Sequence, residues 1–338
     1  MTDTLEIRTS PHMTGSASVD VIMRDVVIAL LPTIGFAVYH FGLAALAQLV
    51  VATGTCLLTE RLLSRERTLS DGSAVVTGLL FGLALPPGLP LWMTALGAVV
   101  AVAIGKVLFG GLGCNAFNPA LVGRAFLAAA FPAAMTTWLV PGAGDRFSTL
   151  PAAILTVPFA SPAVDAVTAA TPLSSWKFAH VGTSATDLAL GLTAGSIGET
   201  SAVLILLGGL YLFVRRVANW RIPLAILGIV GFVSAALHAF DPARYPPAEF
   251  MLLSGGLMLG AVFMATDTVA SPLTPLGAWL YGALIGALTL TIRLYGGMPE
   301  GIMYAILLGN AVAPLIDRWV QPRVFGSGPA SARWKRPA

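Results

Sequence analysis

Charged residues are scarce in this sequence. Only 10% of its 338 residues are Asp, Glu, Lys or Arg, whereas 56% are hydrophobic. A soluble globular domain carries about 25% charged residues, so the composition excludes that class. The net charge of +3 is too small to indicate a nucleic-acid partner, and we expect none.

Cysteine and histidine are also rare. The two cysteines, Cys56 and Cys114, form no CxxC pair, which excludes a self-contained four-cysteine iron–sulfur cluster or a zinc ribbon. The four histidines show no metal-ligand spacing, so we expect no metal site. Cys114 is expected to be a small packing residue rather than a ligand. The chain also lacks the glycine-rich fingerprint of a nicotinamide-dinucleotide fold.

The sequence does contain many long apolar runs. A helix needs about 20 apolar residues to cross about 30 Å of hydrocarbon. The runs are apolar on all sides, as at 45–58 and 204–214, which favours helices over a barrel of alternating strands. The sequence therefore predicts an all-α polytopic membrane protein. The ten expected transmembrane helices cover 25–40, 43–60, 72–87, 91–108, 116–134, 202–217, 222–239, 250–266, 276–292 and 301–318.

Basic residues indicate how these helices are oriented. With the N-terminus in the cytoplasm, the basic residues of the short connections fall mainly on the cytoplasmic side, as the positive-inside rule requires. These include Arg24, Arg61, Lys106, Arg215 and Arg318. We therefore predict that both termini are cytoplasmic. The polar, proline-rich segment 135–201 then forms a long extracytoplasmic loop.

The two apolar halves share short patterns. Gly78 to Gly82 matches Gly256 to Gly260, and Asn115 with Pro119 matches Asn310 with Pro314. The matching segments lie five spans apart, which inverts their orientation in the membrane, as in many transporters. Chance matching of the small residues common in membrane helices is the alternative. The predicted divisions are 1–24 (cytoplasmic), 25–134 (first five-helix repeat), 135–201 (loop), 202–318 (second five-helix repeat) and 319–338 (cytoplasmic tail).

Two segments are candidates for cofactor binding. Residues 165–173 read Asp-Ala-Val-Thr-Ala-Ala-Thr-Pro-Leu, an ordinary polar turn if taken alone. The small neighbours of Thr171 are expected to leave its hydroxyl accessible to a modifying enzyme. The glycine-rich segment 110–119 can be a tight turn with a helix cap. Its glycines could equally admit a flat ring, with the amides of Asn115 and Asn118 at the ring edges.

Ionisable residues near the membrane are the third group. Arg124 falls within an expected span, where a charge needs a partner, a cavity or a route to the interface. It could pair with a carboxylate, contact a flavin or quinone-like group, or extend to the membrane surface. Asp267 ends a span and could serve an ion path, although a solvated helix end is the alternative. Arg124 and Asp267 are the candidates for that path.

Several motifs together resemble those of one known family. Asp165, Thr168, Ala170 and Thr171 match the Asp-x-x-Ser/Thr-Gly/Ala-Ala-Thr motif recognised by a flavin transferase, although Ala169 stands where the family often has glycine. Other matching segments are 71–74, 110–120, 195–201, 265–267 and 314–317. The chain thus resembles the NqrB/RnfD family nearly end to end. This family supplies membrane subunits to the Rnf complex and to the sodium-pumping NADH:quinone reductase. The short N-terminal segment favours the Rnf branch.

The resemblance implies a cofactor set and a set of partners. FMN is expected to be esterified through its phosphate to Thr171, and riboflavin to bind near Asn115 and Asn118. The implied function is electron transfer between these flavins in the bacterial inner membrane, as one subunit of a redox-driven translocase that moves Na⁺ or H⁺. The implied partners are a second FMN-bearing subunit, iron–sulfur subunits, a flavin transferase and membrane lipid.

Other functions remain open from the sequence. A quinone-linked NqrB-type subunit is the closest alternative. Inverted repeats alone would also suit a solute channel or transporter without redox chemistry, and an apolar scaffold could serve only to anchor redox subunits.

Overall fold

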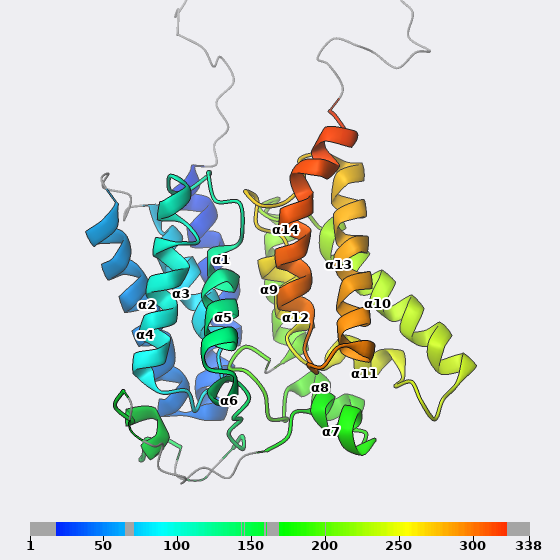
Figure 1. Ribbon diagram of the computed structural model, residues 1–338, viewed down its shortest axis with the longest axis horizontal. Helices are drawn as coiled ribbons and strands as arrows, with labels where there is room; N and C mark the ends of the chain where they lie inside the picture. Colours follow the sequence, from blue (N-terminus) through cyan, green and yellow to red (C-terminus); the bar gives the residue numbers. More distant parts are fainter. Residues whose placement is uncertain are drawn as a thin grey trace, which may run out of the picture.

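The computed structural model describes residues 18–64, 71–142, 144, 146–158, 160, 169–199 and 201–322. Helices make up the regular structure of these residues, so the predicted all-α fold is confirmed. Figure 1 shows two groups of roughly upright helices side by side, one formed by the first part of the chain and one by the last.

The first group contains two long helices, several shorter ones and a 3₁₀ turn. Its elements are α1 (Val19–Phe41), α2 (Leu43–Leu63), α3 (Ser73–Leu83), α4 (Leu91–Ala103), η2 (Val107–Phe109), α5 (Pro119–Ala130) and α6 (Pro132–Met135). Sequence-local signals set several of these bounds. Pro86 and Pro87 follow α3 and cannot continue it. Asn118 caps α5, and Pro119 occupies its first turn, where a missing N–H does no harm.

The second group follows a segment of short helices. The intervening elements are η3 (Ala152–Leu155), α7 (Pro172–Ala179) and α8 (Ala185–Leu190). The second group consists of α9 (Ala202–Val214), α10 (Arg221–Phe240), α11 (Ala248–Leu253), α12 (Leu257–Leu259), the π-helix η4 (Gly260–Met264), α13 (Pro275–Tyr295) and α14 (Ile302–Trp319).

Each of the ten expected spans coincides with helical structure, but they differ in length. Five helical segments in the described chain are long and apolar enough to cross a membrane: Val19–Phe41, Leu43–Leu63, Leu91–Phe109, Arg221–Phe240 and Pro275–Tyr295. A polytopic membrane protein fits these segments. The expected spans at 72–87, 116–134 and 202–217 are instead apolar helices of 11, 12 and 13 residues.

The expected continuous span at 250–266 is wrong. The chain breaks between α11 and α12, where Gly255 adopts a φ of +65°, a conformation that side chains disfavour. A five-residue π-helix then completes the segment. Hydropathy detects the apolar run but carries no information about this interruption.

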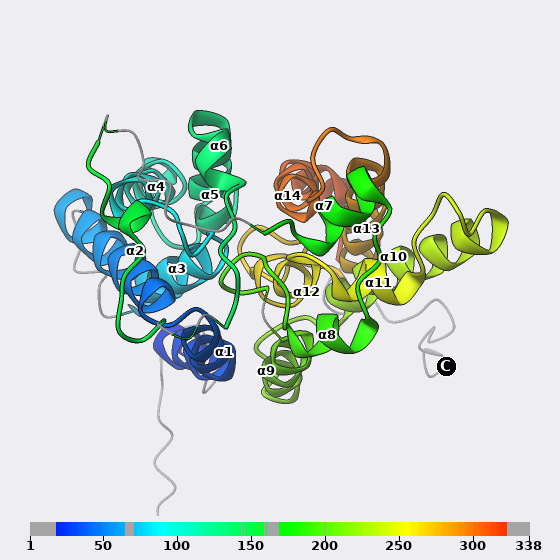
Figure 2. The same cartoon turned by 90° about the horizontal axis from the view of Figure 1, so that it is seen from below.

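The two groups make close backbone contact where α1 meets α9. A Cβ on Gly208 would lie only 2.3 Å from the carbonyl oxygen of Ala29. Glycine therefore permits an approach that other residues would prevent, as small residues do at membrane helix interfaces. Seen from below in Figure 2, α1 and α9 lie next to each other, and α5, α12 and α14 line the boundary between the groups.

The helix ends define two opposite faces of the molecule. In Figure 1, α1 begins and α14 ends on one side, whereas α6, α7 and α8 lie on the other. The segment that carries Thr171 is therefore on the face opposite the described chain ends.

Candidate functional site

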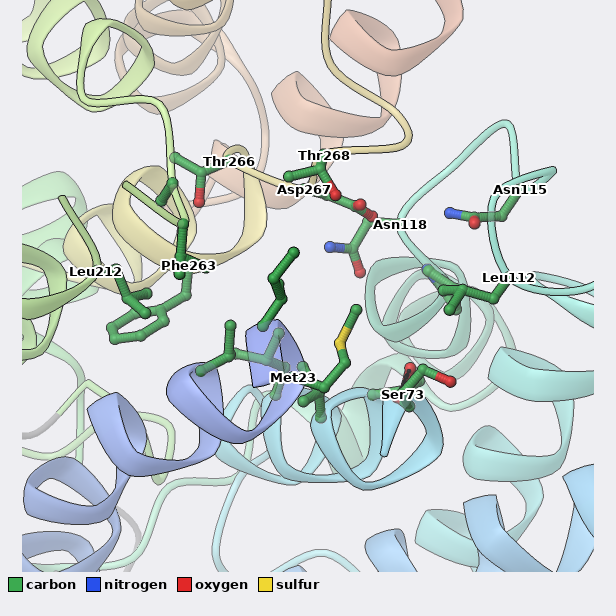
Figure 3. Close-up of a pocket in the computed structure, with 18 of the residues that line it drawn as sticks. Met23, Ser73, Leu112, Asn115, Asn118, Leu212, Phe263, Thr266, Asp267 and Thr268 are labelled. Atoms are coloured by element: carbon green, nitrogen blue, oxygen red, sulfur yellow. Dashed lines mark hydrogen bonds between the residues drawn. The ribbon is translucent and has the colours of Figure 1, made fainter. Parts of the chain in front are cut away.

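The first cavity lies between the two helix groups at the N-terminal end of α5. In Figure 3 the amide of Asn118 points into the space between Ser73 and Asp267. We call this space the Asn118 cavity; it holds about 100 Å³. Its polar wall consists of Ser73, Thr77, Lys106, Asn115, Asn118, Thr266, Asp267 and Thr268.

Asn118 both caps a helix and reaches across to the second group. Its Oδ1 accepts hydrogen bonds from the backbone N–H groups of Ala120 at 3.0 Å and Leu121 at 3.4 Å. Its Nδ2 donates to the carbonyl oxygen of Met264 at 3.2 Å. A side-chain amide carries two N–H donors, so one of them remains for a ligand. Asn115 is also buried and donates to the carbonyl oxygen of Phe117 at 3.1 Å.

The glycine-rich segment before α5 is a turn with left-handed backbone. Gly110, Gly111 and Gly113 have φ values of 112°, 100° and 90°, so the predicted tight turn is confirmed. Cys114 in this turn is exposed, whereas Cys56 is buried. The packing role expected for Cys114 is therefore wrong.

Lys106 is a cavity residue that sequence reasoning missed. The sequence treats it only as a topology marker, but it is 2% exposed and lines the Asn118 cavity. Its Nζ lies 2.6 Å from Glu60 Oε1 and 2.6 Å from Ser73 Oγ. A basic residue at the end of an apolar run looks the same in sequence whether it faces water or a buried carboxylate, so only its tertiary neighbours reveal the difference.

A second, larger cavity lies near the other end of α5. We call it the Trp138 cavity; it holds about 510 Å³. Its polar and aromatic wall includes Arg124, Thr136, Trp138, Ser174, Phe178, Glu300 and Tyr304. Ala169 and Ala170 also line it and directly precede Thr171.

Thr171 is the N-cap of α7, and its side chain is buried. Its Oγ1 accepts a hydrogen bond from the N–H of Ser174 at 3.3 Å and donates to Ser174 Oγ at 3.1 Å. The residue is only 2% exposed, so the expected accessible hydroxyl is wrong for the folded chain. Helix capping explains the difference, because the hydroxyl turns inward to satisfy the first turn. Asp165 and Thr168 lie outside the described residues.

The helix that carries Thr171 is anchored to the second group. Lys177 Nζ donates to the carbonyl oxygens of Arg293 and Met298 at 3.0 Å each, and to that of Gly296 at 2.5 Å. Trp176 packs on Phe250 with ring centroids 5.7 Å apart. Burial lowers the pKa of Lys177 below its ordinary value. These contacts fix α7 against α11 and the C-terminal end of α13.

The structure separates the two candidate ion-path residues. Arg124 Nη2 lies 2.7 Å from Glu300 Oε2, with both side chains largely buried. Of the possibilities open from the sequence, pairing with a carboxylate is the one observed. Asp267 accepts from the N–H of Val269 at 3.0 Å and lines the Asn118 cavity instead. The two residues therefore face different cavities.

The helix α5 connects the two cavities. Pro119 lines the Asn118 cavity and Ala128 lines the Trp138 cavity. These two residues are nine positions apart along the helix, which corresponds to about 14 Å of rise. A small cavity and a larger one thus lie at opposite ends of one short helix.

Comparisons with known proteins agree in their family assignment. The chain is similar to the D subunit of the proton-translocating ferredoxin:NAD(+) oxidoreductase complex of Clostridium ljungdahlii, with 42% identity over 95% of this chain and 96% of that protein. It is also 42% identical to the D subunit of the Na(+)-translocating ferredoxin:NAD(+) oxidoreductase complex of Acetobacterium woodii, over 95% of each chain. The D subunit of the ion-translocating oxidoreductase complex of Stutzerimonas stutzeri is 40% identical over 95% of this chain and 97% of that protein. Residues 6–326 match the family described as NQR2, RnfD, RnfE, and the chain therefore belongs to that family.

Proposed function

We propose that this chain is the flavin-bearing membrane subunit of an ion-translocating ferredoxin:NAD⁺ oxidoreductase complex. It passes electrons between FMN on Thr171 and a second flavin, riboflavin, in the Asn118 cavity. The observation that supports this most directly is the pair of cavities at the two ends of α5, one beside Thr171 and one beside Asn115 and Asn118. The names of the similar proteins support the complex.

The Trp138 cavity fits an FMN attached to Thr171. Its volume of about 510 Å³ lies within the range of about 300–1,000 Å³ typical of small-molecule sites. Trp138 and Tyr304 offer faces for a flat ring. The N-terminus of α7 favours a phosphate nearby. Bound FMN would supply one- and two-electron chemistry, while these residues hold and orient it.

The polar groups that line the Asn118 cavity suit an uncharged flavin. The free N–H of Asn118 and the amide of Asn115 suit ring edges that both donate and accept hydrogen bonds. The cavity of about 100 Å³ is small for a three-ring system. Binding therefore requires lining side chains such as Met23 to move, which an unbranched methionine does readily.

The arrangement of the helices supports an inverted repeat. In the first group α4 packs between α2 and α5, and in the second α13 packs between α10 and α14. The described chain begins and ends on one face (Figure 1), as ten spans with both termini in the cytoplasm require. We place the protein in a bacterial inner membrane, with 25–134 and 202–318 as the repeats and 135–201 as the outer loop.

The identity of the moved ion is a separate matter. The two relatives at 42% identity are named for different ions, H⁺ and Na⁺, so overall similarity favours neither. Arg124 and Asp267 each line one of the two proposed flavin cavities. We assign them the role of changing the ion path when the charge of the nearby flavin changes. The second FMN-bearing subunit, the iron–sulfur subunits and the flavin transferase complete the proposed set of partners.

The mass of the peptide that contains residues 165–180 tests the covalent cofactor. Protein from the native host is expected to carry the mass of one FMN less one water on Thr171 and to fluoresce on a denaturing gel. Thr171→Ser keeps the hydroxyl and should retain modification, whereas Thr171→Ala should abolish it. An unmodified peptide together with no flavin absorbance would instead favour a channel or a structural anchor.

A further inference from the structure

A buried ion pair on the wall of the Asn118 cavity has no part in the flavin contacts assigned so far. Lys106 and Glu60 are 2.6 Å apart, and their side chains are 3% and 2% exposed. Lys106 follows α4, and Glu60 lies near the end of α2, so the pair joins two helices of the first group. Lys106 lines the cavity and Glu60 stands behind it.

Stability alone gives a poor reason for this pair. Removing two charges from water is costly, and well-packed apolar residues of similar volume often stabilise a fold as well or better. The pair therefore calls for a role that an apolar contact could not fill.

The hydrogen bonds of the Lys106 ammonium indicate such a role. A lysine ammonium has three donors. Two of them are directed to Glu60 Oε1 and Ser73 Oγ, each at 2.6 Å. Ser73 Oγ in turn donates to Asp71 Oδ1 at 2.5 Å, so its own proton is committed elsewhere. The third ammonium donor remains for a ligand in the cavity that Lys106 lines.

The other charged group on the cavity wall lies on the second helix group. Asp267 lines the same cavity, and its Oδ1 accepts from the N–H of Val269. An occupant therefore lies between a cation on the first group and a carboxylate on the second. Its electron affinity will depend on the balance between them, because charges interact strongly where water is excluded.

We propose that Lys106 contacts the flavin in the Asn118 cavity and raises its reduction potential, with Glu60 as the counter-charge that limits the increase. This inference rests on the flavin proposed for that cavity. A reduced flavin carries more negative charge than an oxidised one, so a nearby cation stabilises the reduced form. Lys106 is the nearer of the pair to the cavity, and its effect therefore outweighs that of Glu60.

The test uses opposite charge changes at neighbouring positions. The full chain carrying Thr171→Ala is purified, so that covalent FMN contributes no signal, and its bound flavin is titrated spectroelectrochemically. Lys106→Met is expected to lower the midpoint potential, Glu60→Gln to raise it, and Lys106→Arg to keep it close to the parent value. If the pair had only a structural role, Lys106→Met and Glu60→Gln would shift the midpoint potential in the same direction, or neither would shift it.

The possible outcomes separate the two proposals. If the parent protein holds no flavin, the function proposed for this cavity fails. If it holds flavin and the two neutral variants do not shift its potential in opposite directions, the role of Lys106 is refuted. Should Lys106→Met not fold, Lys106→Met with Glu60→Leu leaves no member of the pair unpaired. This double variant is expected to bind flavin more weakly and at a lower potential than the parent, and an unchanged potential would refute the proposal.

Discussion

Arg124 and Glu300 connect the two helix groups through a single short contact. Arg124 belongs to α5 in the first group, and Glu300 precedes α14 in the second. A second link at the opposite face joins Asp25 of α1 to Arg215 at the end of α9, with oxygen and nitrogen 3.1 Å apart. At residue scale the boundary between the groups is therefore polar at both ends. Removing Arg124 or Glu300 leaves a largely buried charge behind, whereas in the second link only Asp25 is buried and Arg215 is half-exposed.

Arg124→Met is expected to destabilise the chain by about 3–5 kcal/mol, because it leaves the carboxylate of Glu300 buried without its partner. Glu300→Met alone should have a similar effect. The double variant should recover part of the loss, since neither member of the pair is then left without the other, whereas buried Glu199 still loses its interaction with Arg124. Unfolding of the purified protein in detergent, analysed as a double-mutant cycle, measures the coupling. Additive effects would show that the contact contributes nothing.

Residues of this kind mark the limit of what the sequence can predict. Arg124 stands out because a charge within an apolar run needs an explanation, but its partner lies 176 positions away. Lys106 does not stand out, because it lies at the end of an apolar run, where basic residues are common. Its partner Glu60 lies at the end of another apolar run. Asn115 and Asn118 can be picked out from the sequence. A helix cap and a ligand contact both call for an asparagine at this turn, so either role points to the same residues.

At the scale of elements, α7 is the helix on which the proposed function depends most. It has eight residues, with Thr171 capping its N-terminus and Lys177 anchoring it to the end of α13. The buried hydroxyl of Thr171 cannot meet an enzyme while α7 is docked in this way. The proposed attachment of FMN to Thr171 therefore requires α7 to be undocked, either during folding or in a transient open state.

This requirement predicts the effect of loosening the helix. In flavin transfer, the Thr171 oxygen forms a bond to the FMN phosphate of a flavin dinucleotide donor, the diphosphate bond breaks, AMP leaves and the hydroxyl proton is lost. Folded, unmodified protein is expected to react slowly with purified transferase. Lys177→Met should react several-fold faster because it loses three hydrogen bonds to carbonyls, whereas Lys177→Arg should remain slow. Intact-mass measurements over time give the rates, and equal rates for all three proteins would contradict the expectation.

Elements are predictable where hydropathy alone determines them. The long helices follow from apolar runs that must satisfy their backbone within lipid. The break at Gly255 and the helix α7 are not predicted, because each depends on contacts with other parts of the chain. Leu173 of α7 is buried, although its local sequence reads as a polar turn.

At the scale of the whole molecule, the main expectation is which face meets the cytoplasm. The turn before α5 and the helix α7 lie on opposite faces (Figure 1). The chain contains two cysteines, of which Cys114 in that turn is exposed and Cys56 is buried. The natural protein therefore carries its own reporter of orientation.

A membrane-impermeant thiol reagent is expected to label Cys114 in inverted membrane vesicles and not in intact spheroplasts. Phe178 of α7 is 71% exposed, so Phe178→Cys combined with Cys114→Ser should show the reverse pattern. Labelling read by mass spectrometry decides the orientation. If Cys114 reacts from outside the cell, the predicted cytoplasmic location of both termini is wrong.

The anchoring of α7 has a consequence for energy conversion. The flavin proposed on Thr171 would be carried by a helix fixed to the second group, whereas most residues around the Asn118 cavity belong to the first. Any rocking of one group against the other thus changes the gap that an electron must tunnel across. Because tunnelling slows steeply with distance, the same movement that opens a route for an ion would also set the timing of electron transfer.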